Sequence, residues 1–246
     1  MTTEIRHNQI ELAFSKASNL YSQNSSVQKE VVKYIISKFA KNSFSTILDL
    51  GSGDGEITKN LLQKEILKSN YQILAVDFSE KMLDFHFKNS RIQTLKANFD
   101  ETQSFQKIEK YFNKSQIDLV VSASALQWSK NLTQALKNIQ NLKSKKTVLS
   151  LFTSNTYSEI QNYFDISSPI LSLESILESV NLTFKNPKIE ILNYSREFES
   201  SLDILKSIKN SGVSASLNRV SVAKLRKFIQ DKPFSKLSYQ VVLIEI

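Results

Sequence analysis

The chain of 246 residues carries a net charge of +8, and hydrophobic residues make up 41% of it. This fraction is ample for a buried core and excludes a globally disordered chain, while no apolar run approaches the roughly 18–20 residues of a membrane-spanning helix. Because cysteine is absent and the only histidines are His7 and His86, the composition excludes thiolate metal sites and a cysteine nucleophile. It leaves little for a zinc site or a histidine-based triad.

The basic charge favours an anionic partner such as nucleic acid, an acidic protein or an anionic lipid surface. A basic drift in composition explains the charge equally well, because the lysines are spread along the chain. The tightest group, residues 142–146, is typical of a solvated turn, so we expect no nucleic-acid site and no membrane association. The missing cysteines and the polar N-terminal segment, which lacks an apolar signal core, predict a cytoplasmic protein without a bound metal.

Apolar residues at helical spacing predict two N-terminal helices, over residues 8–23 and 27–40. From residue 44 onward, short apolar runs typical of buried strands alternate with helical segments. We expect strands at 44–50, 71–77, 91–97, 116–124 and 146–152, and helices at 56–67, 79–87 and 131–142. This alternation predicts βαβ units with right-handed crossovers in a parallel sheet.

After Phe152 the pattern loosens. Residues 158–164 and 172–180 are helical in spacing, and residues 188–198 alternate like a strand. Residues 200–230 are again helical, with an interruption at Gly212, and residues 235–246 end the chain as a strand. We therefore predict one α/β domain over residues 1–246, with a Rossmann-like doubly wound sheet that is mostly parallel and has an antiparallel C-terminal edge. N-terminal helices (1–40) and a helical cap insertion (200–232) complete it.

Three of the four glycines, Gly51, Gly53 and Gly55, fall within five positions between the first predicted strand and its helix. Such a turn lets a ligand approach the backbone and exposes unpaired N–H groups. A dinucleotide site needs G-x-G-x-x-G, but Glu56 occupies the third glycine position and Asp54 adds a second negative charge. These acids weigh against a pyrophosphate, and the missing G-K-[ST] excludes a P-loop.

S-adenosylmethionine suits an acidic turn better, because its reactive end carries a sulfonium and an ammonium and no phosphate. The stretch "LDLGSGDG" (48–55) resembles motif I of the class I S-adenosylmethionine-dependent methyltransferases. This resemblance implies the seven-stranded fold of that class and this cofactor. It also implies that Asp49 orients the site, while Gly51, Ser52 and Gly53 make room for the methionine part.

The end of the second predicted strand carries the next candidate. Asp77 follows Gly55 by 22 residues, where an acid accepts hydrogen bonds from both ribose hydroxyls. An aspartate in that position taken alone is more often a helix cap. The segment "VDFSEKML" (76–83) resembles the second motif of the family, which places Phe78 and Met82 near the adenine or the ribose.

Three further residues complete the predicted cofactor site. Asn98 stands where relatives usually carry an aspartate that hydrogen-bonds the adenine amino group, and its side-chain oxygen can still accept that bond. Phe99 would flank the adenine ring, although ordinary packing in the core explains it nearly as well. In this class the stretch that corresponds to residues 120–136 faces the methyl donor and the acceptor, so Ser122 is a further candidate for binding the cofactor.

Segments far from motif I resemble the malonyl-[acyl-carrier protein] O-methyltransferases of early biotin synthesis. Residues 13–31 resemble the family's N-terminal helices, and residues 124–132 resemble its A-L-Q-W segment. Residues 150–160 resemble the entry to its lid, residues 202–216 resemble its insertion motif, and the end of this chain resembles its last strand. The resemblance implies an acceptor carboxylate on a malonyl group held by an acyl-carrier protein, whose acidity suits a basic enzyme. We expect a monomer.

A malonyl carboxylate is already ionised at neutral pH, so alignment of the reacting atoms matters more than a general base. The resemblance suggests that Tyr21 closes over the donor and that Gln127 and Trp128 shape the pocket. Three cations are candidates for holding the acceptor carboxylate, although a solvated surface explains each of them too: Lys206, Lys209 and Arg196.

Other functions stay open on the sequence alone. The A-L-Q-W segment also resembles trans-aconitate methyltransferases, which would make the acceptor a free small carboxylate. A non-catalytic cofactor-binding partner subunit is a further alternative, and a dinucleotide oxidoreductase is the third.

Overall fold

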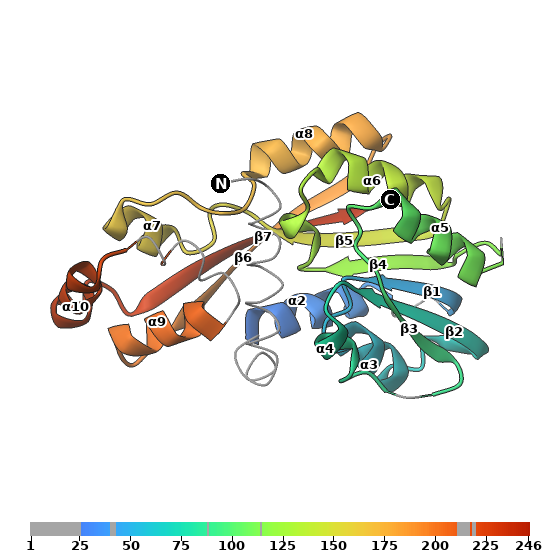
Figure 1. The fold of residues 1–246 in the computed structure, drawn as a ribbon, viewed down its shortest axis with the longest axis horizontal. Helices are drawn as coiled ribbons and strands as arrows, with labels where there is room; N and C mark the ends of the chain where they lie inside the picture. The colour runs from blue at the N-terminus through green and yellow to red at the C-terminus, as the bar shows by residue number, and fades with distance from the viewer. Residues whose placement is uncertain (1–25, 40–42, 88, 114, 211–216, 218–219) are drawn as a thin grey trace.

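The computed structural model describes residues 26–39, 43–87, 89–113, 115–210, 217 and 220–246. Seven strands form one sheet in the order β3-β2-β1-β4-β5-β7-β6 (Figure 1). The strands are β1 (Phe44–Leu50), β2 (Leu67–Asp77), β3 (Ile92–Lys96), β4 (Leu119–Ala123), β5 (Lys146–Phe152), β6 (Lys188–Glu197) and β7 (Lys236–Glu245). The first five run parallel, and β7 is antiparallel to both of its neighbours. The predicted fold class is confirmed.

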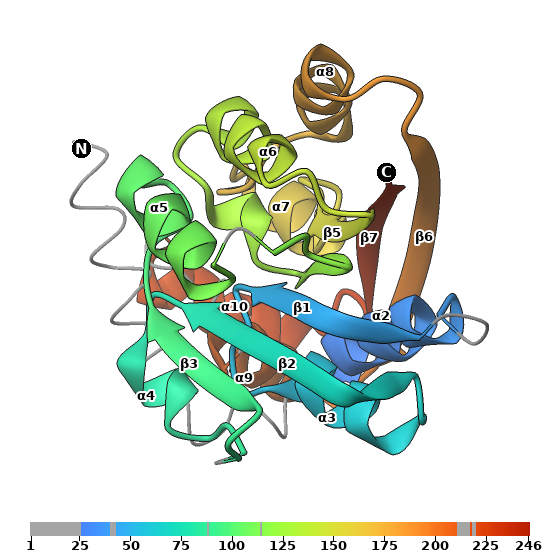
Figure 2. The same cartoon turned by 90° about the vertical axis from the view of Figure 1, so that its right-hand side faces the viewer.

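Helices cover both faces of the sheet, as Figure 2 shows with α5, α6 and α8 on one side and α2 and α3 on the other. Along β1, Ile47 packs into the core under α2 and α3, and Leu48 into the core under α5, α6 and α8, as the two-residue period of a strand requires. The helices are α2 (Ser26–Ser37), α3 (Glu56–Gln63), α4 (Glu80–Leu83), α5 (Thr102–Tyr111), the short 3₁₀ helix η1 (Leu126–Trp128), α6 (Leu132–Asn141), α7 (Ser158–Phe164), α8 (Leu173–Thr183), α9 (Ser201–Asn210) and α10 (Val222–Asp231).

The winding of the chain reverses at β1. From β1 the chain adds β2 and β3 on one side, and then returns to place β4 and β5 on the other. Ligands of open α/β sheets bind in the crevice outside the carboxyl ends of the strands at such a switch point. The glycine turn lies at this edge, because it begins directly after Leu50.

The cap helices α9 and α10 leave the sheet at the same edge. They connect the end of β6 to the start of β7, where Glu197 pairs with Lys236. Phe152 at the carboxyl end of β5 pairs with Val241, so residues 236–240 of β7 extend past the end of β5. The cap therefore stands beyond the carboxyl ends of the parallel strands, at the left of Figure 1.

Three predicted elements differ from the structure. The helix predicted over 56–67 ends at Gln63, because Glu65 adopts a left-handed backbone (φ 52°) and the chain enters β2 at Leu67, before the predicted start of 71. The helix predicted over 79–87 is only the single turn of α4. The sequence analysis assigned nothing to α5, and the helix predicted over 8–23 lies outside the described residues.

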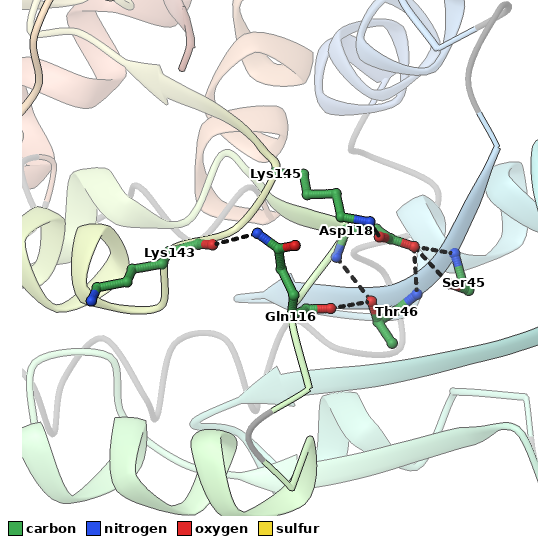
Figure 3. A network of polar contacts seen from close by, with 6 residues as sticks. All are labelled: Ser45, Thr46, Gln116, Asp118, Lys143 and Lys145. Carbon is green, nitrogen blue, oxygen red and sulfur yellow. Dashed lines mark hydrogen bonds and ion pairs between the residues drawn. The ribbon is translucent and has the colours of Figure 1, made fainter.

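The amino ends of β1 and β4 are joined around one carboxylate (Figure 3). Asp118 Oδ2 accepts hydrogen bonds from the Ser45 N–H (2.8 Å), the Ser45 hydroxyl (2.6 Å) and the Thr46 N–H (3.3 Å), while Lys145 Nζ lies 2.8 Å from Oδ1. Burial alone would raise the pKa of Asp118, but the bonds from Lys145, Ser45 and Thr46 hold it well below its usual range.

This network predicts a pH-dependent contribution to stability. Because the pKa of Asp118 is depressed in the folded state, its contribution is present above the unfolded pKa and is lost as pH falls through the folded pKa. We expect Asp118→Asn to lower the free energy of unfolding at pH 7 by roughly 1–3 kcal/mol. Urea denaturation at pH 7 and at pH 3 should show this difference shrink, with exposed Asp84→Asn as a near-neutral control.

Candidate functional site

The turn after β1 is held by the neighbouring strand β2. The N–H groups of Gly51 and Ser52 both donate to the Val76 carbonyl, at 2.8 and 2.9 Å, and the Gly53 N–H donates to Asp77 Oδ2 at 2.9 Å. The expectation that this turn exposes unpaired N–H groups is therefore wrong at these positions. With these donors used inside the protein, the turn is poorly suited to a phosphate, which agrees with its acidic residues.

Close contacts explain two of the glycines. A Cβ atom on Gly51 (φ 73°) would lie 2.2 Å from the Cβ of Ala125, in the segment after β4. A Cβ atom on Gly55 (φ 82°) would lie 3.0 Å from Nδ1 of His86. Both positions also have the left-handed backbone that side chains disfavour, so glycine is needed for space and for conformation.

Two side chains hold the central glycine of the turn, Gly53, one at its N–H and one at its carbonyl. Asp77 accepts from the Gly53 N–H, and His86 Nε2 lies 3.1 Å from the Gly53 carbonyl oxygen. A carbonyl oxygen can only accept, so His86 must carry its proton on Nε2 and leave Nδ1 bare. His86 is buried, and burial lowers its pKa, which keeps the ring neutral.

Two buried carboxyls lie beneath this turn. Asp49 is fully buried on β1, and burial raises its pKa to about 7, although the Thr58 hydroxyl (3.3 Å) opposes the shift. Burial likewise raises the pKa of Asp77 to about 6, against hydrogen bonds from the Ser79 and Gly53 N–H groups. Burial also raises the pKa of Asp54. A bound cation would offset the cost of burying these charges.

Buried polar atoms without a hydrogen-bond partner gather at the same edge. Among the described residues eight such side-chain atoms occur, and buried polar groups are normally satisfied. Six of the eight lie near the carboxyl ends of β1, β2 and β4, His86 through its contact with the glycine turn: Asp49 Oδ1, Ser52 Oγ, Ser79 Oγ, His86 Nδ1, Ser124 Oγ and Gln127 Oε1. A concentration of unused donors and acceptors at a switch point is what a polar ligand would satisfy.

The structure brings the other predicted cofactor residues to this edge in different ways. Met82 is buried, with its Cε 3.6 Å from where a Gly53 Cβ would stand, and Phe78 is half-buried. Phe99 is buried in the core, 3.9 Å from the Cβ position at Gly51. Asn98 Oδ1 already accepts from the Asp100 N–H (3.0 Å), and the hydroxyl of buried Ser122 donates to the Leu50 carbonyl (2.6 Å).

The predicted acceptor pocket is partly described. Gln127 donates from Nε2 to the Ser124 carbonyl (2.6 Å), which leaves its buried Oε1 without a partner in the described chain. Trp128 is buried beside it in η1. Tyr21 lies outside the described residues. Gln127 and Trp128 are thus at the same edge as the glycine turn.

The three predicted acceptor-binding cations are not brought together. Arg196 on β6 forms an ion pair with Glu30 of α2 and donates to the Ser26 hydroxyl (3.2 Å). Lys206 and Lys209 are exposed on α9, and Lys206 Nζ lies 3.5 Å from Asp203 Oδ1. Their role in binding the acceptor stays a prediction.

The sequence analysis missed His86, Ser79 and Ser124 as members of this edge. A lone histidine in a short helical segment gives no signal of a contact with the glycine turn 33 residues away. Ser124 has a left-handed backbone (φ 57°), a strained conformation that clusters at functional sites, and only the structure reveals it. No group of three or more metal-ligating side chains occurs in the part of the chain that the structure describes.

This strand order, with a glycine turn after β1 and an acid at the end of β2, defines a class I methyltransferase. A family model described as "Methyltransferase domain" matches residues 41–238, and the chain belongs to that family. S-adenosylmethionine is its cofactor. The YcgJ protein from Bacillus subtilis has the same fold, with a TM-score of 0.57 at 12% identity over 88% of this chain and 97% of that one.

Among curated proteins, the chain is similar to one group of methyltransferases. The chain is 26% identical to malonyl-[acyl-carrier protein] O-methyltransferase 2 of Coxiella burnetii, over 85% of this chain and 82% of the relative. It is 27% identical to malonyl-[acyl-carrier protein] O-methyltransferase of Neorickettsia risticii, over 96% of this chain and 95% of the relative. The chain is therefore similar to this group along nearly its whole length.

The contact between His86 and Gly53 predicts a test of the turn. We expect His86→Ala to weaken S-adenosylhomocysteine binding by roughly three- to tenfold, because it removes one hydrogen bond to the turn. His86→Gln keeps an N–H donor and should retain most of the affinity. Isothermal titration calorimetry measures both, and equal affinity of wild type and His86→Ala would show that the turn holds its shape without this bond.

The buried acids predict a pH-dependent affinity for S-adenosylmethionine. Near their raised pKa values Asp49 and Asp77 are partly protonated, whereas a bound sulfonium and ammonium favour their ionised forms. Binding should therefore release protons, and affinity should increase from about pH 5 to about pH 8 and then level off. Calorimetry in buffers of different ionisation enthalpy measures the release, which should be smaller for S-adenosylhomocysteine. A pH-independent affinity would contradict the assignment of these acids.

Proposed function

We propose that this chain transfers the methyl group of S-adenosylmethionine to the free carboxylate of a malonyl thioester on an acyl-carrier protein, an early step of biotin synthesis. The observation that carries the proposal is the similarity to malonyl-[acyl-carrier protein] O-methyltransferases, which extends over 96% of this chain for the Neorickettsia relative. This similarity includes the segments outside the cofactor-binding half, to which we assign the selection of the acceptor.

The reaction is one displacement. A carboxylate oxygen attacks the methyl carbon, the new C–O bond forms as the C–S bond breaks, and the bonding electron pair returns to sulfur. The products are a methyl ester and S-adenosylhomocysteine, and no proton is transferred. Because the malonyl carboxylate is ionised at neutral pH, the protein needs to align the three reacting atoms and exclude water.

The side chains near the glycine turn fit a reaction without a general base. His86, the only histidine in the described chain, is buried and already bonded to the Gly53 carbonyl. Gln127 and Ser124 offer neutral polar atoms. Such a site can orient an anionic acceptor, but it is poorly equipped to deprotonate a hydroxyl or an ammonium group.

Within this proposal the predicted residues take separate roles. Asp77 binds the ribose hydroxyls, Asn98 and Phe99 bind the adenine, and Asp49 with the glycine turn accommodates the methionine part. Gln127 and Trp128 line the acceptor side, and Tyr21 closes over the donor. The acceptor carboxylate is assigned to Lys206, Lys209 or Arg196.

An acceptor comparison tests the proposal. With radiolabelled donor, we expect the highest kcat/KM for malonyl-carrier protein, a lower value for malonyl-coenzyme A, and little transfer to free malonate or trans-aconitate. Acetyl-carrier protein is the matched control, because it differs only in lacking the free carboxylate and should accept no methyl group. Preference for a free dicarboxylate would instead assign the chain to a small-acid methyltransferase.

A cellular test is independent of the purified acceptor. Expression of the chain should restore growth without biotin to a bacterial strain that lacks its own malonyl-carrier methyltransferase. The Gly51→Val variant, whose side chain would collide with Ala125, should fail to do so. Failure of the wild-type chain, when it is present at normal levels, would contradict the biotin assignment.

A further inference from the structure

The cap is one of the strongly basic segments of the chain. Between Ser201 and Lys236 the sequence has eight basic and two acidic residues, so this segment carries +6 of the total of +8. The other 210 residues together carry +2. Residues 110–158 carry the same net charge of +6, from seven lysines and one acid, Asp118, so the chain has two strongly basic segments and the remaining residues are net acidic. The cap is distinguished from the other basic segment by its place at the edge of the sheet that bears the glycine turn.

Both acids of the cap are already used by neighbours. Asp203 accepts from the Ser200 hydroxyl (2.6 Å) and lies 3.5 Å from Lys206 Nζ. Asp231 accepts from the Tyr163 hydroxyl (3.0 Å) and pairs with Lys227 (2.7 Å). Five other cations form no ion pair within the described residues: Lys209, Lys224, Arg226, Lys232 and Lys236.

The cap helices present apolar residues beside these cations. On α10, Val222, Arg226 and Ile229 share one face at a spacing of four and three residues, and Val222 is 64% and Ile229 37% exposed. On α9, Leu202, Lys206 and Lys209 repeat this spacing, and Leu202 is 44% exposed. We call these six residues the cap face.

Buried residues anchor both cap helices on the side opposite the cap face. Phe228 is the one buried residue of α10, and its ring packs against Tyr163 (5.2 Å), Phe164 (5.3 Å) and Phe234 (5.4 Å) between centroids. On α9, Ile204 and Ile208 are buried. Each helix is therefore anchored on one side, which leaves the opposite side free to contact a partner without losing internal packing.

We propose that the cap face binds the acidic surface of a protein, which for this chain is the carrier that delivers the malonyl group. This inference rests on the proposed function. The cap stands at the edge of the sheet that bears the glycine turn, so a carrier bound there is on the acceptor side. Cations attract an acidic surface, and the aliphatic residues between them match the apolar parts of a protein better than a nucleic acid, which favours aromatic stacking.

Charge reversal with a matched control tests the cap face. Arg226→Glu reverses the cap-face cation of α10, while Lys188→Glu reverses an exposed charge at the opposite edge, at the start of β6. Both variants lower the net charge from +8 to +6. Circular dichroism and S-adenosylhomocysteine affinity establish that each variant is folded.

We expect the α10 variant to raise KM for malonyl-carrier protein by about tenfold or more, with kcat/KM for malonyl-coenzyme A unchanged within about twofold. The opposite-edge variant should change KM for the carrier by less than about threefold. Increasing salt should weaken carrier binding to wild type, and much less to the α10 variant. Equal effects of the two variants would overturn the inference, because total charge rather than the cap face would then explain them.

Direct binding separates this inference from the proposed function. The fluorescence anisotropy of labelled malonyl-carrier protein measures binding whether or not a methyl group is transferred. If neither malonyl acceptor is methylated, the proposed function fails, and the cap inference is then decided by whether wild type binds the carrier more tightly than the α10 variant does. Absence of carrier binding, or equally tight binding of a short RNA or DNA, would overturn the cap inference alone.

Discussion

The architecture of the site depends on one close approach, between Gly51 and Ala125. A side chain at position 51 would meet Ala125 at 2.2 Å, so the turn after β1 and the segment after β4 can lie together only because the side chain is missing. That approach places Gln127 and Trp128 next to the turn. The hydrogen bonds that the turn donates to Val76 and Asp77 then fix the end of β2 beside the turn. The same backbone contact therefore positions the glycine turn and the two residues to which the proposed function assigns the acceptor side.

The site is an unfavourable environment in the absence of ligand. Buried Asp49 and Asp77 are destabilised as anions, and six nearby polar atoms lack partners in the described chain. Functional sites commonly keep such costs, and the rest of the fold offsets them. Here the Asp118 network at the opposite edge and the two apolar cores stabilise the fold and offset the cost of the cofactor edge. Stability and function thus lie at opposite ends of the same strands.

The sequence predicts the sheet and the cofactor turn well, because buried parallel strands are continuous apolar runs and the glycines cluster. It predicts α3 too long, since Lys64 and Glu65 are good helix formers and only the left-handed backbone of Glu65 ends the helix early. It misses His86, whose role comes from a contact with distant Gly53. It places Lys206 and Lys209 on a helix, but their exposure depends on how that helix packs.

The direct pairing of Glu197 with Lys236 has a consequence for the history of the fold. The cap begins and ends on two residues that lie opposite each other on β6 and β7, as the loop of a β-hairpin does. Connecting segments of different length can be exchanged between such points without changing the register of β6 and β7, because the cost of closing a loop grows only slowly with its length. Under the proposed function, acceptor choice can therefore change by replacement of the connection between β6 and β7, while the glycine turn stays the same.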